Sequence, residues 1–225
     1  PKTIDNDVKH NELSIGYDTA VDVATNALDM LQPTAASHRR VMILEVMGRD
    51  AGHIALNSGI AGGADVILIP EINYSIKNIA SHIEKIRRNG RNHVLVVVAE
   101  SVKKEDGTKA TVKFIDGEVR LGGIGSYLGD QIYKLTEAET RVTVLGHVQR
   151  GAQPTHRDRL IASAFGVYAV DLIQKEKFNR IVVWQNRTVT DIELESVAGQ
   201  SQTVNQNDPL IKVAQGLGIY VGELN

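Results

Sequence analysis

Residues 41–52 of the chain read VMILEVMGRDAG, an apolar, β-branched run that leads into two glycines. Similar runs recur at residues 66–69 (VILI), 93–99 (HVLVVVA), 142–145 (VTVL) and 181–184 (IVVW). Continuous apolar runs of this kind are typical of strands that are buried on both faces, as in parallel sheets. The stretch at 41–52 therefore predicts a buried strand whose carboxyl end opens into a glycine turn.

Stretches with helical spacing separate these runs. Apolar residues recur every three or four positions in residues 17–31 and 75–89, and Asn89-Gly90 marks a helix stop. Further candidate helices cover residues 124–135 and 157–173. Strands that alternate with helices predict βαβ units, and hence an α/β fold with a mainly parallel sheet.

Two segments depart from this alternation. Residues 103–120 (KKEDGTKATVKFIDGEVR) contain two Asp-Gly pairs and alternate in polarity, which predicts an exposed hairpin. The polar tail turns apolar at residues 210–221, which predicts a closing helix or strand that packs back on the body.

Composition excludes several classes of protein. The 225 residues include 25 basic and 27 acidic side chains, a net charge of -2 that argues against a general nucleic-acid binder. Cysteine is absent, so the chain has no disulfide framework, thiol nucleophile or zinc-thiolate site. No apolar run approaches the roughly 20 residues that span a bilayer, and the first residues lack a signal-peptide core. We expect a cytoplasmic protein that binds neither membrane nor nucleic acid.

The first residues, PKTIDND, offer two carboxylates and a hydroxyl. If the segment is extended, Thr3, Asp5 and Asp7 point to one side. One Asp could then accept a proton from a substrate hydroxyl while the other holds Mg²⁺, and Lys2 could contact a phosphate oxygen. A polar turn or a helix cap is the alternative interpretation of this segment.

Polar residues also follow several predicted strands. Arg49 comes after the first strand, Glu100 ends the third, and His147 and Arg150 follow the strand that Arg141 opens. Open α/β sheets bind ligands at the carboxyl ends of their strands, where a guanidinium and an imidazole suit a phosphate. The Gly122–Gly125 segment (GGIG) also looks like a phosphate loop, but an ordinary turn before a helix explains it better.

Five segments together resemble the phosphofructokinase family, in the right order along nearly the whole chain. They are PKTIDND (1–7), SHRR (37–40), EVMGRDAG (45–52), VVVAES (96–101) and RVTVLGHVQRGAQPTHRDR (141–159). Each motif is modest evidence, whereas the ordered set is highly specific. The resemblance implies a 6-phosphofructokinase, which makes fructose 1,6-bisphosphate from fructose 6-phosphate in glycolysis.

The resemblance also implies a role for each matching residue. Asp5 would be the base, Asp7 would help to hold Mg²⁺, and Thr3, Lys2 and Arg49 would support the transferring phosphoryl group. The implied fructose 6-phosphate pocket is formed by Met47, Gly48, Arg49, Glu100, His147 and Arg150. Arg40 and Arg141 match arginines that reach the 6-phosphate from a neighbouring subunit, which implies a homo-oligomer with the active site at a subunit interface.

The family's glycine-rich, N-terminal donor-binding segment should precede Pro1 and is missing from these 225 residues. We therefore expect the 225 residues alone to bind the phosphoryl donor poorly and to lack activity. Lys2 resembles the pyrophosphate-dependent branch of the family, though it also occurs in a branch of ATP users, so it favours pyrophosphate only slightly over ATP.

The implied architecture has two Rossmann-like lobes. Residues 16–149 would form the sugar-phosphate lobe, and residues 1–15 and 150–225 would complete the donor lobe and its closing tail. A non-catalytic phosphofructokinase-like subunit, or a sugar-phosphate-binding module, is the alternative function. A dinucleotide-dependent oxidoreductase is disfavoured because no G-x-G-x-x-G turn follows the first strand.

Overall fold

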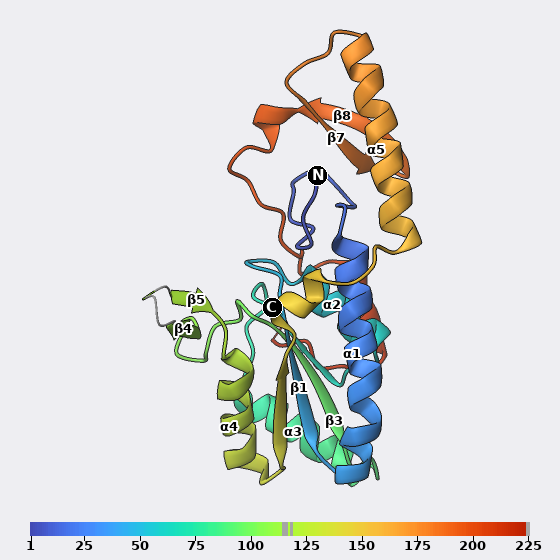
Figure 1. Ribbon diagram of the computed structural model, residues 1–225. Coiled ribbons are helices and arrows are strands. Elements are labelled where there is room, and N and C mark those ends of the chain that lie inside the picture. The colour runs from blue at the N-terminus through green and yellow to red at the C-terminus, as the bar shows by residue number, and fades with distance from the viewer. Residues whose placement is uncertain (114–116, 118, 224–225) are drawn as a thin grey trace.

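A computed structural model describes residues 1–113, 117 and 119–223 (Figure 1). Its main sheet has four strands, β1 (Val41–Val46), β2 (Val66–Leu68), β3 (Val94–Ala99) and β6 (Thr140–Val144). The spatial order is β2-β3-β1-β6, and every neighbouring pair is parallel. All side chains of β1, β2 and β3 are buried, as their largely apolar runs predict, and this includes Glu45 of β1. The parallel α/β fold is confirmed.

Helices cover both faces of this sheet. The helices α1 (Tyr17–His38) and α2 (His53–Ala61) contact each other on one face, and α3 (Ile76–Arg88) and α4 (Ile124–Thr136) contact each other on the other (Figure 1). The helices predicted at residues 17–31, 75–89, 124–135 and 157–173 are all present. The first of them, α1, runs seven residues past its predicted end at Leu31. It continues through Pro33 because Ala35 is fully buried against Met42 and Leu95, and this packing offsets the lost backbone hydrogen bond.

A smaller part of the molecule stands beyond the carboxyl edge of the sheet. It contains α5 (His156–Gln174) and the antiparallel pair β7 (Arg180–Gln185) and β8 (Thr188–Glu193) (Figure 1). The 3₁₀ turns η1 (Gly146–Arg150) and η2 (Leu194–Ser196) lie before α5 and after β8.

The prediction of a strand at residues 181–184 is confirmed, but its assignment to a parallel sheet buried on both faces is wrong. Only Val183 is fully buried in β7, which forms a hairpin with the unpredicted β8. Asn186 and Arg187 form the two-residue turn, and both have positive φ, 49° and 63°. Such turns favour Asn-Gly, so Asn-Arg gave no hairpin signal in the sequence.

The predicted excursion at residues 103–120 is a hairpin. Its antiparallel strands are β4 (Thr111–Lys113) and β5 (Val119–Leu121), and Lys103 also pairs with Lys109. Residues 114–116 and 118 of the predicted segment lie outside the described residues.

The tail returns to the main body, as the sequence predicts. The helix α6 (Pro209–Gly216) packs against α2, and Tyr220 pairs with Val66 beside β2. On its way the tail runs along the N-terminal segment, where the Gln202 N–H donates to the Asp7 carbonyl at 2.7 Å. The first residues are therefore held between the two parts of the molecule. No helix in the described residues is long and apolar enough to cross a membrane.

Candidate active site

The N-terminal segment is bent rather than extended, so the condition under which Thr3, Asp5 and Asp7 would point to one side is not met, and the alternative of a polar turn describes the backbone. The chain bends at Ile4 and Asp5, and Asn6 has a φ of 53°. The Thr3 hydroxyl nevertheless meets Asp5. It accepts from the Asp5 N–H at 3.1 Å and donates to the Asp5 carboxylate at 3.4 Å. A tight turn, and not strand geometry, brings the two side chains together.

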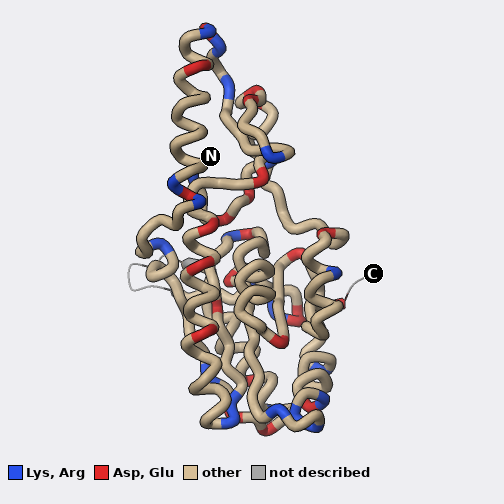
Figure 2. Tube along the Cα trace, turned by 90° about the vertical axis from the view of Figure 1, so that its right-hand side faces the viewer, with Lys and Arg blue, Asp and Glu red and all other residues tan. Residues whose placement is uncertain are grey.

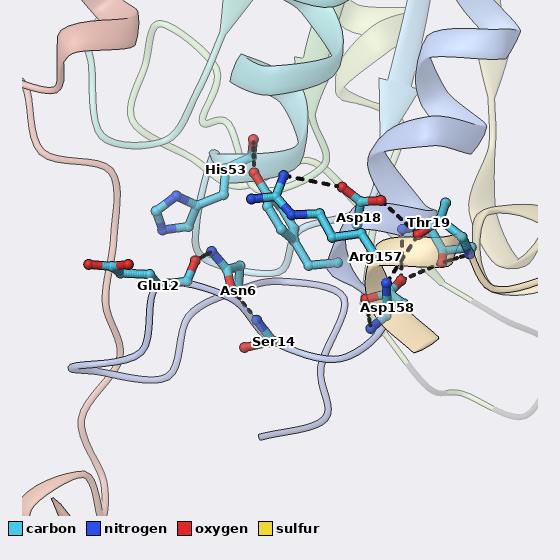
Figure 3. A network of polar contacts seen from close by, with 11 residues as sticks. Asn6, Glu12, Ser14, Asp18, Thr19, His53, Arg157 and Asp158 are labelled. Atoms are coloured by element: carbon cyan, nitrogen blue, oxygen red, sulfur yellow. Dashed lines mark hydrogen bonds and ion pairs between the residues drawn. The ribbon is translucent and has the colours of Figure 1, made fainter. Parts of the chain in front are cut away.

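Asn6 fixes the shape of this segment (Figure 3). Its amide donates to the Glu12 carbonyl at 3.0 Å and accepts from the Ser14 N–H at 2.9 Å. Asn tolerates the left-handed conformation that this bend requires. The hydrogen bonds of the Asn6 side chain therefore fix the shape of the loop that carries Asp5.

The carboxyl end of β1 presents Met47, Gly48 and Arg49. Gly48 has a φ of 155°, and an added Cβ would lie 2.7 Å from the Ala51 carbonyl oxygen, so glycine is required. Arg49 has a φ of 50°, which is uncommon for a residue other than glycine. This conformation, which costs free energy, leaves the Arg49 side chain exposed at the sheet edge.

Glu100 lies at the end of β3, the neighbour of β1. Its Oε1 accepts from the Arg49 N–H at 3.2 Å, so the carboxylate holds the glycine turn after β1. Its own N–H donates to the Val46 carbonyl at 2.9 Å. Burial raises the pKa of Glu100, while hydrogen bonds from the Arg49 and Gly48 amides oppose the rise.

The turn η1 supplies the third group of residues at this edge of the sheet. It follows β6, which pairs with β1 on the side opposite β3. His147 and Arg150 are exposed, whereas Gln149 between them is buried. The Gln149 Oε1 accepts from the Met47 N–H at 2.9 Å, and its amide donates to the Ala20 carbonyl at 3.4 Å. Gln149 thus ties η1 to β1 and α1, which directs His147 and Arg150 toward the sheet edge.

These strand ends surround a cavity of about 830 Å³. Six residues proposed from the sequence line it: Asp5, Met47, Arg49, Glu100, His147 and Arg150. The remaining lining comes from β1, the hairpin, the glycine loop before α4, and β6: Glu45, Val112, Leu121, Gly122, Gly123, Ser126, Val144 and Gly146. The cavity therefore offers three carboxylates (Asp5, Glu45 and Glu100), two guanidinium groups (Arg49 and Arg150) and an imidazole (His147).

A second cavity of about 350 Å³ is also lined by residues of the N-terminal segment. Lys2 and Thr3 line it, together with Gly16, Thr19 and Asp158. Arg150 lines both cavities. The N-terminal segment therefore contributes residues to both cavities, and the two cavities share the Arg150 guanidinium.

Asp5 is only 9% exposed. Burial raises its pKa most, and the nearby Asp7 carboxylate raises it further, while Arg150, the Thr3 hydroxyl bond and Arg49 oppose the rise. A carboxylate with a raised pKa is a stronger base than an exposed Asp, which suits proton abstraction.

Four proposed residues do not line either cavity. Gly48 lies between the lining residues Met47 and Arg49, and Asp7 lies two positions after the lining residue Asp5. Arg40 and Arg141 lie at the amino ends of β1 and β6, where both bind Glu139, Arg40 at 3.0 Å. Several basic residues lie at this end of the main body, interspersed with acidic ones (Figure 2). Within one chain, the structure does not bring these two arginines to the proposed sugar pocket.

The sequence assigned no role to Glu45 or Gln149, and for Gly122 and Gly123 it favoured an ordinary turn before a helix over a phosphate loop. Glu45 had a signal, because it is the one charged residue in the apolar run 41–46. Gln149 had none, since its partners Met47 and Ala20 are distant in the sequence.

The fold and the cavity together define an α/β protein with a cavity of mixed charge at the carboxyl edge of a parallel sheet, which is where such folds bind their ligands. The sequence profile described as Phosphofructokinase matches residues 1–173. The chain therefore belongs to the phosphofructokinase family.

The curated relatives that the chain matches are also named as phosphofructokinases. The chain is 58% identical over 223 residues to "ATP-dependent 6-phosphofructokinase 1" of Nostoc sp. and 54% identical over 222 residues to "ATP-dependent 6-phosphofructokinase 1" of Synechocystis sp.. Each alignment covers 99% of this chain and 62% of the relative. The chain thus spans less than two thirds of the length of these relatives.

Solved structures agree in fold. Phosphofructokinase from Saccharomyces cerevisiae matches with a TM-score of 0.76 at 28% identity, over 96% of this chain and 26% of that one. A pyrophosphate-dependent phosphofructokinase from Nitrosospira multiformis matches with a TM-score of 0.80 at 21% identity, over 99% of this chain and 60% of that one.

Proposed function

We propose that the protein transfers a phosphoryl group to the 1-hydroxyl of fructose 6-phosphate and forms fructose 1,6-bisphosphate, a cytoplasmic step of glycolysis. The observation that carries this proposal is the place of Asp5. This buried carboxylate with a raised pKa lines the larger cavity, while its neighbours Lys2 and Thr3 line the smaller one. A base between an acceptor space and a donor space suits phosphoryl transfer, which needs positioning and charge neutralisation but no covalent nucleophile.

In the proposed reaction, the sugar's O1 forms a bond to the terminal phosphorus of the donor. The bond from that phosphorus to its bridging oxygen breaks, and the electron pair leaves with the shortened donor. The O1 proton passes to the Asp5 carboxylate. Thr3, Lys2 and Arg49 stabilise the negative charge on the phosphoryl group in transit, since fixed donors and cations act there without reorganisation.

The sugar phosphate occupies the larger cavity in this proposal. Glu100 accepts hydrogen bonds from sugar hydroxyls, and the backbone at Met47 and Gly48 approaches the sugar closely. His147 and Arg150 bind anionic oxygens, because a guanidinium fits a phosphate with two parallel hydrogen bonds.

Asp7 is the residue that would hold Mg²⁺. The described residues contain no group of three or more His, Cys, Asp or Glu side chains that could bind a metal alone. Mg²⁺ usually takes only one or two carboxylates and completes its shell with waters and substrate phosphates, so a single carboxylate from Asp7 is compatible with it. When bound, the ion neutralises charge on the donor's phosphates.

The proposed donor is ATP. The identity of residue 2, a lysine, slightly favours pyrophosphate as the donor, but the relatives at 54% and 58% identity are named ATP-dependent. We further propose a homo-oligomer in which Arg40 and Arg141 complete the neighbouring subunit's sugar pocket. Residues 16–149 would form the sugar-phosphate lobe, and residues 1–15 and 150–225 would belong to the donor lobe.

A turnover assay tests the function. The full-length gene product is supplied with fructose 6-phosphate and Mg²⁺, and ATP and pyrophosphate are offered in separate reactions. Formation of fructose 1,6-bisphosphate with ATP alone supports the whole proposal, and formation with pyrophosphate alone changes only the donor. Absence of turnover with both donors, together with retained fructose 6-phosphate binding, contradicts the proposal and favours a non-catalytic sugar-phosphate-binding subunit.

A further inference from the structure

Glu45 is a buried carboxylate to which the proposed reaction assigns no role. It lies in β1, at the centre of the main sheet, and is 1% exposed. Burying a carboxylate among apolar side chains is costly unless hydrogen bonds compensate it. Glu45 has two such bonds. Its Oε1 accepts from the Gly123 N–H at 3.0 Å, and its Oε2 accepts from the Gly125 N–H at 2.8 Å.

Both donors belong to the beginning of α4. Gly123 is the N-cap residue of this helix, and because it has no side chain it leaves the first N–H groups without a local partner. The first turn of a helix carries a partial positive charge and attracts anions. Glu45 lies in β1, far from α4 in the sequence. Its carboxylate nevertheless accepts hydrogen bonds from the first N–H groups of α4, as an N-cap side chain or a bound anion would.

The same glycine loop forms one wall of the larger cavity. Gly122, Gly123 and Ser126 line the cavity, and Val112 and Leu121 from the hairpin extend the wall. Gly122 and Gly123 have φ values of 148° and 86°. The hairpin strands that precede them have three residues each, and a two-stranded sheet this short is marginally stable by itself. This wall therefore needs stabilising contacts at the point where the hairpin joins α4.

Glu45 and α4 fit together without spare room. A Cβ added to Gly125 would lie 2.8 Å from the Val142 Cγ1 and 3.1 Å from the Glu45 Oε2. A shift of a few tenths of an ångström at either partner would therefore move the start of α4. The side chain that anchors this end also lines the cavity itself.

We propose that Glu45 is a positioning residue for the sugar-phosphate pocket, which fixes the Gly122–Ser126 wall by holding the N-terminus of α4. This inference rests on the proposed function. Because Glu45 acts through the wall and not through proton transfer, its loss weakens sugar binding and leaves the chemical step largely intact.

The test compares three variants of the full-length protein. Glu45→Gln keeps the shape but has one acceptor oxygen where two are needed, and its amide group faces an N–H. We expect the KM for fructose 6-phosphate to rise roughly tenfold, with kcat and the donor KM within about twofold of wild type. Gly125→Ala keeps the Glu45 charge but pushes α4 away, and should raise the same KM.

Gly129→Ala is the matched control, since it crowds the same helix one turn later, where an added Cβ lies 3.2 Å from the Thr140 Oγ1. It should lower the Tm and leave the KM for fructose 6-phosphate unchanged. Hydrogen exchange provides a readout that is independent of activity. The amides of residues 119–126 should exchange faster in Glu45→Gln and Gly125→Ala than in Gly129→Ala.

The two proposals can fail separately. If wild-type protein does not turn over, the proposed reaction is wrong, and hydrogen exchange alone decides whether Glu45 holds the wall. If wild type turns over but Glu45→Gln keeps a wild-type KM and wild-type exchange at residues 119–126, the role of Glu45 is wrong. If Glu45→Gln does not fold, an unchanged sugar KM in Gly125→Ala contradicts the inference.

Discussion

The carboxylate of Asp158, in the first turn of α5, caps the N-terminus of α1 through Thr19 (Figure 3). Its Oδ2 accepts from the Thr19 N–H at 2.9 Å and from the Thr19 hydroxyl, and its Oδ1 accepts from the Gly16 N–H at 2.8 Å. In return, the Thr155 hydroxyl at the start of α5 donates to Asp18 of α1 at 2.7 Å. The two helices thus cap each other where the two parts of the molecule meet.

Replacing Asp158 should destabilise the protein strongly. Asp158→Ala leaves three donors at the start of α1 without an acceptor, in a place where Asp158 itself is 2% exposed. We expect the free energy of unfolding to fall by about 2–4 kcal/mol. Urea denaturation measures the change. Asp171→Asn, at an exposed position near the end of α5, is the control and should stay within about 0.5 kcal/mol of wild type. A similarly small change in Asp158→Ala would show that other groups satisfy these donors.

Asp5→Asn tests the proposed base. Turnover should fall by about 10²–10⁴-fold because the amide cannot accept the O1 proton. Fructose 6-phosphate binding, measured by calorimetry, should survive. Asp50→Asn is the control, because Asp50 is exposed and binds Lys109 at 3.2 Å on the surface, so its turnover should match wild type. Retained turnover in Asp5→Asn would remove this residue from the mechanism.

The pH dependence of kcat/KM should report the raised pKa of Asp5. The base works only when ionised, so activity is present above its pKa and is lost as the pH falls through it. Because burial and the Asp7 charge raise this pKa, the acidic limb should lie at higher pH than for an exposed Asp.

Asp7→Asn separates the two causes of the raised Asp5 pKa, which are burial and the Asp7 charge. It removes a negative charge beside Asp5, so it lowers the Asp5 pKa and should move the acidic limb to lower pH, even if overall activity drops. A limb that stays in place would mean that Asp7 does not influence the titrating group.

The strands β1, β2 and β3 were predictable because they are buried on both faces and so are almost wholly apolar. The edge strand β6 was found from its β-branched residues, although none of its residues is buried, so its predicted burial on both faces is wrong. The hairpin of β7 and β8 was not predictable, since Asn186-Arg187 lacks the glycine that usually marks such a turn. The residues around the larger cavity were predictable as strand ends, because parallel strands bring their carboxyl ends to one edge. The hydrogen bonds of Glu45 and Gln149 join segments far apart in the sequence, and spacing carries no information about such pairs.

Arg40 and Arg141 give the sharpest test of assembly. Arg40 precedes the six residues of β1, which at about 3.3 Å each place it roughly 20 Å from Met47. It therefore cannot bind a sugar phosphate in its own chain's cavity. If both arginines serve the neighbouring subunit, Arg141→Ser should raise the KM for fructose 6-phosphate strongly, although Arg141 lies far from Asp5 within the chain.

Mixed oligomers distinguish a shared site from an indirect effect. We expect the Asp5→Asn and Arg141→Ser proteins each to be nearly inactive at low sugar concentration. In the test, the two variants are unfolded and refolded together. A mixed pair forms one site with both defects and one with neither, since the intact Asp5 comes from one subunit and the intact Arg141 from the other. Random pairing should therefore restore roughly a quarter of the wild-type rate. Refolding each variant alone is the control, and a mixture no more active than these would place Asp5 and Arg141 in the same chain's site or in separate functions.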